Sequence, residues 1–466
     1  MSSSEHSESG SQQVVTNDVP TLSSLQTSSE PRELIIEGST LQENSSTPIN
    51  TNLAVEESAG ASSSSSSSPS ATSSTATTIT VCVTGGTGFI ASHLIYQLLQ
   101  KGYKIHTTVR SLPKGRDELF QALLNYQKET IPDASNHFFD ENSLKERVQC
   151  FEADLLKEGS FEQAIKECQF VHHVASPYKV TVDDPQLDLV DPAVNGTLNV
   201  LKECVKLRET QSNEDDKRLK RIILTSSIAA IVDTAEENKV YDENDWNTLS
   251  SLKWNPYSFS KVSAEKAAWK FMKECEEKHG NDFLELVTIC PSQVIGKAIM
   301  PKQVNQSHEG IMKIANGEFP VIFSLYLPLV DVIDVAAAHI YAMEYEMNNR
   351  TRFSPSKVER FIVCCETVAM SKVVEILREL YPKESNPWTK RLPTTKLESG
   401  FGNAVAKVAG LFQPKGIRQY INSSIGKPQN FNTTKIKETF GMKFIDTKET
   451  IRNTVDYLMN IGMIKK

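Results

Sequence analysis

Two side chains that can exchange a proton stand four residues apart in the segment Tyr257-Ser258-Phe259-Ser260-Lys261. Four residues is about one helical turn, so Tyr257 and Lys261 share one face of a predicted helix. Free tyrosine has a pKa of about 10, and a nearby ammonium lowers it because it favours the phenolate. We therefore expect Tyr257 to give a proton to a carbonyl oxygen while hydride reaches the carbon. Lys261 would also bind the ribose of a nicotinamide cofactor. The spacing alone is weak evidence, because it is common by chance.

A hydroxyl group is also needed to hold the carbonyl oxygen. Thr225-Ser226-Ser227 follows the predicted strand 222–224, at the carboxyl edge of the expected sheet. We choose Ser227 as the third catalytic residue. The alternative is that either serine only satisfies backbone groups of the turn.

A glycine-rich turn lies between a predicted strand and a predicted helix, the context that makes such a motif informative. Gly85 permits a tight turn, Gly88 permits close approach of a pyrophosphate, and the helix N-terminus supplies free N–H groups. Ala91 replaces the usual third glycine. The alternative is a glycine-rich turn without a ligand. The residues expected to bind the dinucleotide here are Gly85, Gly86, Thr87, Gly88, Phe89 and Ile90.

Two basic residues follow the second predicted strand. Arg110 stands where NAD-specific proteins place an acid, and Lys114 comes four residues later. Their position and charge favour a ribose 2′-phosphate and hence NADPH. The alternative is a pair of solvated surface cations.

Apolar, β-branched strands alternate with amphipathic helices from residue 79 to residue 289. This order predicts an α/β fold, a doubly wound (Rossmann) parallel sheet with helices on both faces. The predicted strands are 79–83, 104–109, 147–151, 170–174, 222–225 and 284–289, and the predicted helices are 90–99, 160–167, 191–207 and 258–278. The stretches 120–146 and 209–221 look inserted, and we expect both to be surface excursions.

Three regions follow from these patterns. Residues 1–77 are Ser/Thr-rich and hold no aromatic residue, which predicts a disordered tail because little apolar surface can be buried. Residues 78–295 form the dinucleotide-binding domain. Residues 296–466 form mainly a smaller substrate-binding lobe, with some elements returning to the first domain and with helices near 370–380 and 451–459.

Charge and composition exclude some classes of protein. Nine acids and one arginine give the tail a net charge of −8, equal to that of the whole chain, so the remainder is neutral. A neutral body argues against nucleic-acid binding. We find no secretory signal and no apolar run long enough to span a membrane. The eight cysteines show no CxxC spacing, which predicts reduced thiols in the cytoplasm and no metal site.

With these residues placed, the sequence resembles the extended short-chain dehydrogenase/reductases. Within them it is similar to the branch of dihydroflavonol reductase, cinnamoyl-CoA reductase and yeast methylglyoxal (ketone) reductase. The matching stretches include VTGGTGFIASHLIYQLLQKGY, VHHVASP, LTSSIAAI, NPYSFSKVSAEKAAW and ICPSQVIG. The resemblance implies NADPH-dependent reduction of a small aldehyde or ketone.

The resemblance also implies further cofactor contacts at matching positions. Asp154 and Leu155 would contact adenine, and Ala175, Ser176 and Pro177 would line the cofactor near the ribose. Pro291 and Val294 would face the nicotinamide, and Ser307 is aligned more loosely. The alternatives are a helix cap for Asp154 and an ordinary loop proline for Pro291.

Two other functions stay open at this stage. One is an epimerase, dehydratase or sterol dehydrogenase, since one fold supports many reactions. The other is a non-catalytic, NADPH-sensing interaction protein whose tail binds an unknown partner. The residues 296–330 match the family poorly, so the substrate is the least transferable feature.

Overall fold

The computed structural model describes residues 79–465, except 178–181, 213, 215–217, 281–282, 350–358 and 411–423. The predicted disordered tail, residues 1–77, lies outside the described residues. So does part of the stretch 209–221, whose described ends belong to a helix that closes at Glu209 and a strand that begins at Arg221.

Seven parallel strands form the central sheet, in the order β11-β7-β5-β4-β1-β2-β3. From β1 the chain adds β2 and β3 on one side, and it then adds β4, β5, β7 and β11 on the other side. The predicted Rossmann class is therefore confirmed. The strands are β1 (Thr80–Val83), β2 (Lys104–Val109), β3 (Val148–Glu152), β4 (Phe170–His173), β5 (Arg221–Thr225), β7 (Glu285–Pro291) and β11 (Arg360–Val363).

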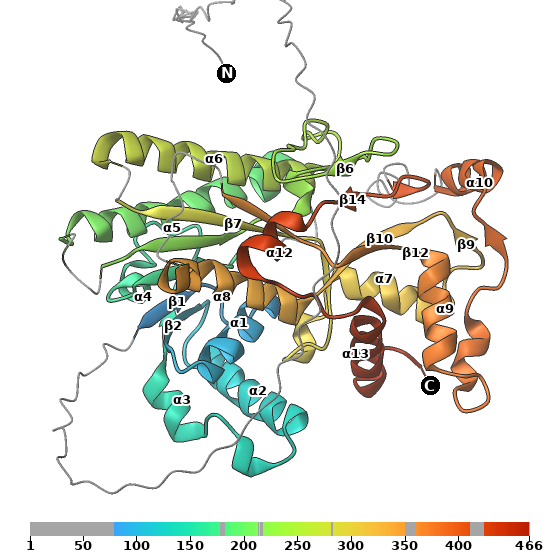
Figure 1. Cartoon of the computed structure of the whole chain (residues 1–466), viewed down its shortest axis with the longest axis horizontal. Helices are drawn as coiled ribbons and strands as arrows, with labels where there is room; N and C mark the ends of the chain where they lie inside the picture. Colours follow the sequence, from blue (N-terminus) through green and yellow to red (C-terminus); the bar gives the residue numbers. More distant parts are fainter. Residues whose placement is uncertain are drawn as a thin grey trace, which may run out of the picture. The chain divides into compact units, whose positions relative to one another are not determined.

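Helices cover both faces of this sheet (Figure 1). α5 packs between α4 and α6 on one face, and α1 packs against α8 and α2 on the other. The helices around the sheet are α1 (Phe89–Gln100), α2 (Lys114–Thr130), α3 (Glu141–Arg147), α4 (Glu162–Ile165), α5 (Asp191–Glu209), α6 (Pro256–His279), α8 (Val332–Asn349) and α12 (Thr434–Phe440).

Most remaining elements follow β7 and form three small sheets with their own helices. β10 pairs with β12 and β8, β13 pairs with β9, and β14 pairs with β6. The strands are β6 (Val240–Tyr241), β8 (Gln293–Ile295), β9 (Ile322–Phe323), β10 (Tyr326–Asp331), β12 (Glu366–Ala369), β13 (Lys396–Leu397) and β14 (Asn430–Phe431). The helices are α7 (Gln306–Ala315), α9 (Met370–Leu380), α10 (Gly400–Gly410) and α13 (Thr447–Asn460).

The short helical turns lie in the connections between these elements. η3 and η4 matter for the site described below. The turns are η1 (Ala134–Asn136), η2 (Gln186–Val190), η3 (Ile228–Ala230), η4 (Pro301–Gln303) and η5 (Pro387–Arg391).

The C-terminal elements bury a hydrophobic cluster of their own, which runs from Ile295 to Ile464. α9 shows why: its buried Met370, Val373 and Leu377 recur at helical spacing and form one apolar stripe. In contrast, α8 and β11 return to the central sheet and bury side chains in its main core. The helices expected near 370–380 and 451–459 are confirmed.

The expectation that 120–146 is a surface excursion is wrong. This stretch supplies most of α2 and all but the last residue of α3, and Phe120, Leu123 and Leu144 are buried in the main core. Leu119, Phe120 and Leu123 recur at helical spacing, a periodicity that the length of the stretch obscured.

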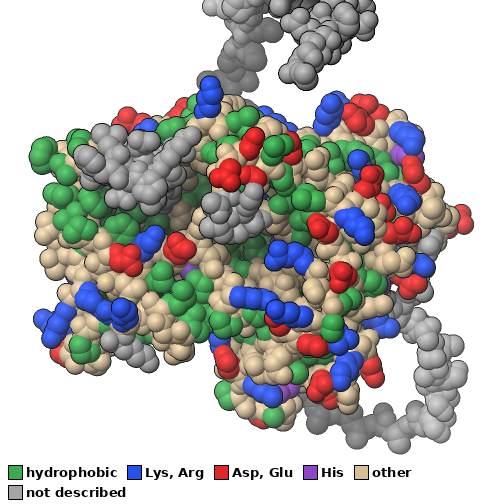
Figure 2. Space-filling model, turned by 180° about the vertical axis from the view of Figure 1, so that it is seen from behind, with side chains coloured by type: hydrophobic (Ala, Val, Ile, Leu, Met, Phe, Trp, Pro, Cys, Tyr) green, Lys and Arg blue, Asp and Glu red, His purple; other side chains and the backbone are tan. Residues whose placement is uncertain are grey.

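Charged side chains of both signs lie among one another on the face shown in Figure 2. Among the described residues, no helix is long and apolar enough to cross a membrane.

Burial lowers the pKa of all five fully buried histidines, and four of them, all except His308, are shifted far enough to stay neutral in the fold. Burial lowers the pKa of His93 to about 4 and that of His173 and His339 to about 3, and it lowers the pKa of His172 well below its ordinary value. Two buried carboxyls act in the opposite sense, because burial raises the pKa of Asp331 to about 6 and that of Asp334 to about 7.

These shifts predict how stability depends on pH. Below pH 6.5 the unfolded chain binds protons on histidines that the native state leaves neutral, so the free energy of unfolding falls. The two aspartates gain protons in the native state and oppose this loss. Four histidines against two carboxyls predict a loss of about 2–3 kcal/mol per pH unit between pH 6 and pH 5.

Denaturant unfolding at several pH values measures this slope. In His93→Gln one titrating group is removed, so we expect the slope to become shallower by about 1.4 kcal/mol per pH unit. A free energy of unfolding that stays constant from pH 6.5 to pH 5 would contradict the argument.

Candidate active site

The site lies where the carboxyl ends of β1 and β4 meet, at the reversal of strand order. Thr84, the residue after β1, accepts hydrogen bonds on Oγ1 from the backbone N–H groups of Val174 and Ala175, both at 3.0 Å. Its own hydrogen can point to His173 Nδ1, which lies 3.1 Å away. This buried hydroxyl therefore joins the ends of the two strands.

The glycine turn follows Thr84 directly, and its backbone leaves no room for side chains. Gly85 has a φ of +73°, and a Cβ there would lie 3.0 Å from the Cβ of Ala175. A Cβ on Gly86 would lie 2.3 Å from Thr107 Oγ1. Gly88 caps α1 without a side-chain cap. The first N–H groups of α1 thus face an open backbone cradle, which suits a pyrophosphate.

The side chain of Gln303 also holds this turn in place, and the sequence did not predict this contact. Its buried Nε2 donates to Thr87 O at 3.1 Å, to Gly88 O at 3.2 Å and to Ser92 Oγ at 3.0 Å. The contact joins residues 215 positions apart. Nothing in the spacing of the sequence signals it.

The start of α7 lies beside the start of α1. The ring of His308 contacts that of Phe89, with 5.0 Å between the centroids. Ser307 lies in the same first turn of α7 and is half-buried, and Ile90 is half-buried in α1. The loosely aligned Ser307 is therefore near the glycine turn.

Arg110 and Lys114 lie together at the carboxyl end of β2. Arg110 follows the last residue of β2, and Lys114 is the first residue of α2. The first turn of α2 is packed tightly on this strand, since a Cβ on Gly115 would lie 2.8 Å from the Cβ of Val109. Both basic side chains are exposed. The glycine turn lies beside the end of the same strand, since Gly86 N donates to Thr108 O at 2.9 Å.

Asp154 and Leu155 follow β3, at the same edge of the sheet. Asp154 Oδ1 accepts a hydrogen bond from the N–H of Leu156 at 2.9 Å, whereas the cap of α4 is Phe161. The alternative of a helix cap for Asp154 is thus wrong. Leu155 O accepts a hydrogen bond from Asn199 Nδ2 at 2.8 Å.

Lys261, in α6, connects this helix to the end of β4. Its Nζ donates to Ser176 Oγ at 2.9 Å and lies 5.7 Å from the centroid of the Tyr257 ring. Tyr257 is 47% exposed, and Pro177 beside Ser176 is half-buried. The structure therefore brings Tyr257, Lys261 and Ser176 together at the end of β4, which Thr84 joins to the start of the glycine turn.

The two serines after β5 differ in their surroundings. Ser226 is buried, and its Oγ donates to the carboxylate of Glu265. Ser227 is half-buried and begins η3, where its Oγ accepts a hydrogen bond from the N–H of Ala229 at 3.1 Å. That bond uses a lone pair, so the hydrogen of Ser227 can still donate to another oxygen.

The start of α6 is fixed by the buried carboxylate of Asp233. Asn255 has a φ of 48° and caps α6 by accepting from Ser258 N at 3.4 Å. Its amide donates to Asp233, which also accepts from Trp254 Nε1 at 2.7 Å. Tyr257 therefore lies in the first turn of α6, directly after a cap that is held in place by Asp233. Asp233 has no sequence signal, but Asn-Pro before Tyr257 is recognisable as a capping pair.

Pro291 and Val294 lie at the carboxyl end of β7 and in β8. Both are buried, and Val294 belongs to the main core. β8 pairs with β10 rather than with the central sheet. The chain thus leaves the sheet at Pro291, beside the end of β5 where Ser227 lies.

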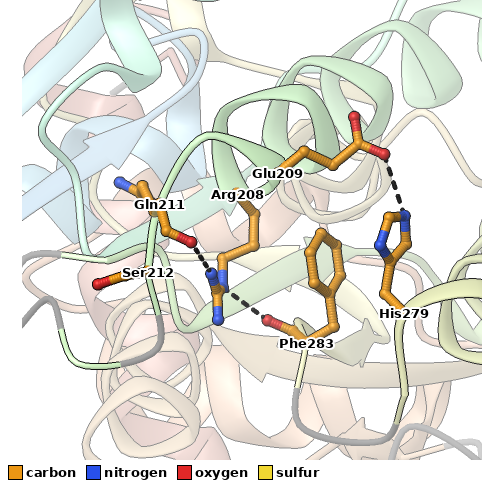
Figure 3. A pocket seen from close by; sticks show the side chains of 6 residues that line it. All are labelled: Arg208, Glu209, Gln211, Ser212, His279 and Phe283. Carbon is orange, nitrogen blue, oxygen red and sulfur yellow. Dashed lines mark hydrogen bonds and ion pairs between the residues drawn. The ribbon is translucent and has the colours of Figure 1, made fainter.

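A small pocket borders these residues and a larger one lies elsewhere. The small pocket is lined by Ser176, Lys261, Ser226 and Glu265, among others. The larger pocket is at the far ends of α5 and α6 (Figure 3). In it, Arg208 donates to the backbone oxygens of Phe283 and Gln211, and His279 lies 3.0 Å from a carboxylate oxygen of Glu209. None of the expected site residues lines the larger pocket.

Within the described ranges, no cluster of three His, Cys, Asp or Glu side chains could hold a metal ion. All eight cysteines are free, and six of them are buried.

Comparison with known proteins identifies the family. Residues 81–353 match the model of the NAD dependent epimerase/dehydratase family. A cinnamoyl-CoA reductase of Medicago truncatula is 37% identical over 317 residues, which cover 66% of this chain and 82% of the relative. A bifunctional dihydroflavonol 4-reductase/flavanone 4-reductase of Malus domestica is 30% identical and covers 66% of this chain and 78% of its own.

Solved structures give the same result. The yeast methylglyoxal/isovaleraldehyde reductase Gre2, solved in complex with NADPH, matches with a TM-score of 0.60 and 25% identity over 83% of this chain and 100% of its own. The expected resemblance to the reductase branch is therefore confirmed.

The close approach at Gly86 gives a testable prediction. In Gly86→Ala the new methyl group would collide with Thr107 Oγ1, which is fixed by its hydrogen bond to Val83 O at 2.7 Å. We expect a loss of about 1–3 kcal/mol in the free energy of unfolding and weaker dinucleotide binding. Denaturant unfolding and a fluorescence titration measure the two effects.

The second-site variant Thr107→Ala removes the colliding atoms and is the control. In the double variant Gly86→Ala/Thr107→Ala, the effect of the alanine at 86 should be smaller than in the wild-type background. An equal loss in both backgrounds would show that the collision is not the cause.

Proposed function

The chain belongs to the NAD dependent epimerase/dehydratase family, and from this premise we propose that it is an NADPH-dependent reductase of aldehydes or ketones. The observation that carries the proposal is the position of Lys261, between the ring of Tyr257 and the hydroxyl of Ser176. The relatives named cinnamoyl-CoA reductase and dihydroflavonol 4-reductase support the same class of reaction.

The residues of this chain supply the proton and stabilise charge. Tyr257 gives the proton of its hydroxyl to the carbonyl oxygen. The ammonium of Lys261 stabilises the phenolate that remains, since opposite charges attract more strongly in a partly buried site. Ser227 donates its hydrogen to the same oxygen. The N–H of Ala229 occupies only one lone pair of Ser227 Oγ and leaves this hydrogen available. When bound, NADPH supplies the hydride to the carbonyl carbon, so that an alcohol and NADP are formed.

The remaining cofactor contacts are proposed by position. The phosphates would lie on the turn Gly85–Gly88 and the start of α1, and the adenine near Asp154 and Leu155. Ser176, together with Ala175 and Pro177, would border the ribose, and Pro291 and Val294 would face the nicotinamide. Ser307, in the first turn of α7 beside the start of α1, would touch the cofactor near the glycine turn. The free state of all eight cysteines supports a reducing compartment such as the cytoplasm.

Tyr257→Phe tests the mechanism. Loss of the acidic hydroxyl should lower kcat by about 10²–10⁴-fold, while the dissociation constant for NADPH stays within about twofold. NADPH oxidation with a panel of aldehydes, diketones and flavonoid-like ketones measures kcat. Tyr103→Phe is the matched control, because that hydroxyl donates to Glu344 at the other edge of the sheet. Equal turnover of Tyr257→Phe and wild type would refute the proposed mechanism.

Arg110→Ala tests the cofactor. Removal of a charge-assisted contact to the 2′-phosphate should raise the KM for NADPH by about 10–100-fold and leave the KM for NADH unchanged. Arg116→Ala is the control, because the Arg116 guanidinium pairs with Asp117, at 2.8 Å. If the two cofactors lose affinity equally in Arg110→Ala, the preference for NADPH does not come from this residue.

A further inference from the structure

A buried ion pair lies directly behind the catalytic residues. Glu265 is 1% exposed and Arg360 is 0% exposed. Arg360 Nε donates to Glu265 Oε1 at 2.8 Å, and Arg360 Nη2 lies 3.4 Å from Oε2. We propose that this pair is a positioning device that sets Ser227 relative to Tyr257 and Lys261. The proposal rests on the function proposed above.

The carboxylate of Glu265 fixes the end of β5. It accepts a hydrogen bond from Ser226 Oγ, and Ser226 N donates to Ile289 O at 2.7 Å. Side chains of successive residues in extended backbone point to opposite sides, and Ser227 is extended with φ −166° and ψ 155°. Because the Ser226 side chain is held on the side of Glu265, the Ser227 side chain points to the opposite side, where the substrate carbonyl would bind.

The same carboxylate belongs to the catalytic helix. Glu265 follows Lys261 by four residues and Tyr257 by eight, so the three side chains lie on neighbouring parts of one helix surface. Ser176, Ser226, Lys261 and Glu265 line one small pocket. Because all three residues belong to α6, a translation or rotation of α6 that displaced Glu265 would also move the proton donor Tyr257 and its neighbour Lys261.

The guanidinium of Arg360 fixes the connection between Ser227 and Tyr257. Its Nη1 donates to the backbone oxygens of Glu243 at 3.0 Å and of Asp245 at 2.7 Å. The central guanidinium carbon, Cζ of Arg360, lies 3.9 Å from the centroid of the Trp246 ring. The segment that joins the two catalytic residues is thus anchored near its middle.

Stability alone does not account for such a pair. A buried ion pair loses hydration on both partners, and an apolar pair of the same volume is often equally stable or more so. Glu265 accepts two further hydrogen bonds, from Thr288 Oγ1 at 3.1 Å and Trp269 Nε1 at 3.4 Å. These donors come from several elements and specify one orientation of the carboxylate, which an apolar contact would not do.

The chain offers a matched control at the other ends of the same strands. Arg221 and Glu285, also buried, begin β5 and β7 and pair at 2.5 Å. Arg221 Nη1 also donates to the backbone oxygen of Ala342 in α8 at 2.6 Å. Glu285→Gln therefore removes a buried carboxylate of the same kind, remote from Ser227.

The test compares Glu265→Gln with Glu285→Gln in the full-length chain. We expect both to lower the melting temperature and to leave the dissociation constant for NADPH within twofold of wild type. Only Glu265→Gln should lower kcat, by tenfold or more. Equal kcat values for the two variants would overturn the proposal.

Ser226→Ala decides the question even where Glu265→Gln does not fold. Ser226→Ala keeps the ion pair and removes only the hydrogen bond from Ser226 to Glu265, through which the pair orients Ser227. We therefore expect kcat to fall about fivefold with little change in melting temperature. In the Ser227→Ala background the same change should have no further effect on kcat, because Ser226 acts through Ser227. Equal losses in the two backgrounds, or no loss in the wild-type background, would overturn the proposal.

Failure of the positioning role and failure of the proposed mechanism give different results. If Tyr257→Phe abolishes turnover and Ser226→Ala does not reduce it, the positioning role fails and the mechanism stands. If Tyr257→Phe turns over normally, the mechanism fails, and with it the premise on which the positioning role rests.

Discussion

The parallel pairing of β1 with β4 is the constraint on which the site depends. The strand that follows β1 in the chain lies on one side of it, and β4 lies on the other, so the connections after the two strands diverge. Divergent connections leave a crevice at the carboxyl edge of the sheet. Thr84 joins the backbones of the two strands at this point. The glycine turn and the residues after β4 therefore lie side by side, and a Cβ on Gly85 would be 3.0 Å from that of Ala175.

Local patterns predicted the parts of the site that lie within one strand–turn–helix unit. The glycine turn and the Tyr257–Lys261 helix are of this kind, because burial of a strand and helical periodicity are readable over about ten residues. Gln303 and Arg360 could not be predicted in this way. Each contacts its partner across the chain, over 215 residues for Gln303 and Gly88 and 95 for Arg360 and Glu265. Such contacts depend on how the C-terminal elements return to the sheet, which composition and spacing do not specify.

Two buried ion pairs lie at opposite ends of β5 and β7. Arg221 and Glu285 join the beginnings of these strands, and Arg360 reaches Glu265 near their carboxyl ends. Each pair also ties the sheet to a neighbouring segment through backbone oxygens, α8 in one case and the residues before α6 in the other. Because an unpaired buried charge is very costly, each pair is formed only when all its elements are in place. β5 and β7 are thereby held to neighbouring elements at two places along their length.

The adjacent serines after β5 show how strand geometry divides two tasks. In extended backbone, one residue faces one side and the next faces the other. Ser226 is therefore available to the buried carboxylate of Glu265, and Ser227 is available to the crevice. The sequence favoured Ser227 and left open whether either serine only satisfies backbone groups of the turn, because both are small, polar and follow the same strand. Their surroundings differ: the hydroxyl hydrogen of Ser226 is used in a buried bond to Glu265, whereas Ser227 Oγ accepts from the N–H of Ala229 and keeps its hydrogen available, which supports the choice of Ser227 in the proposed mechanism.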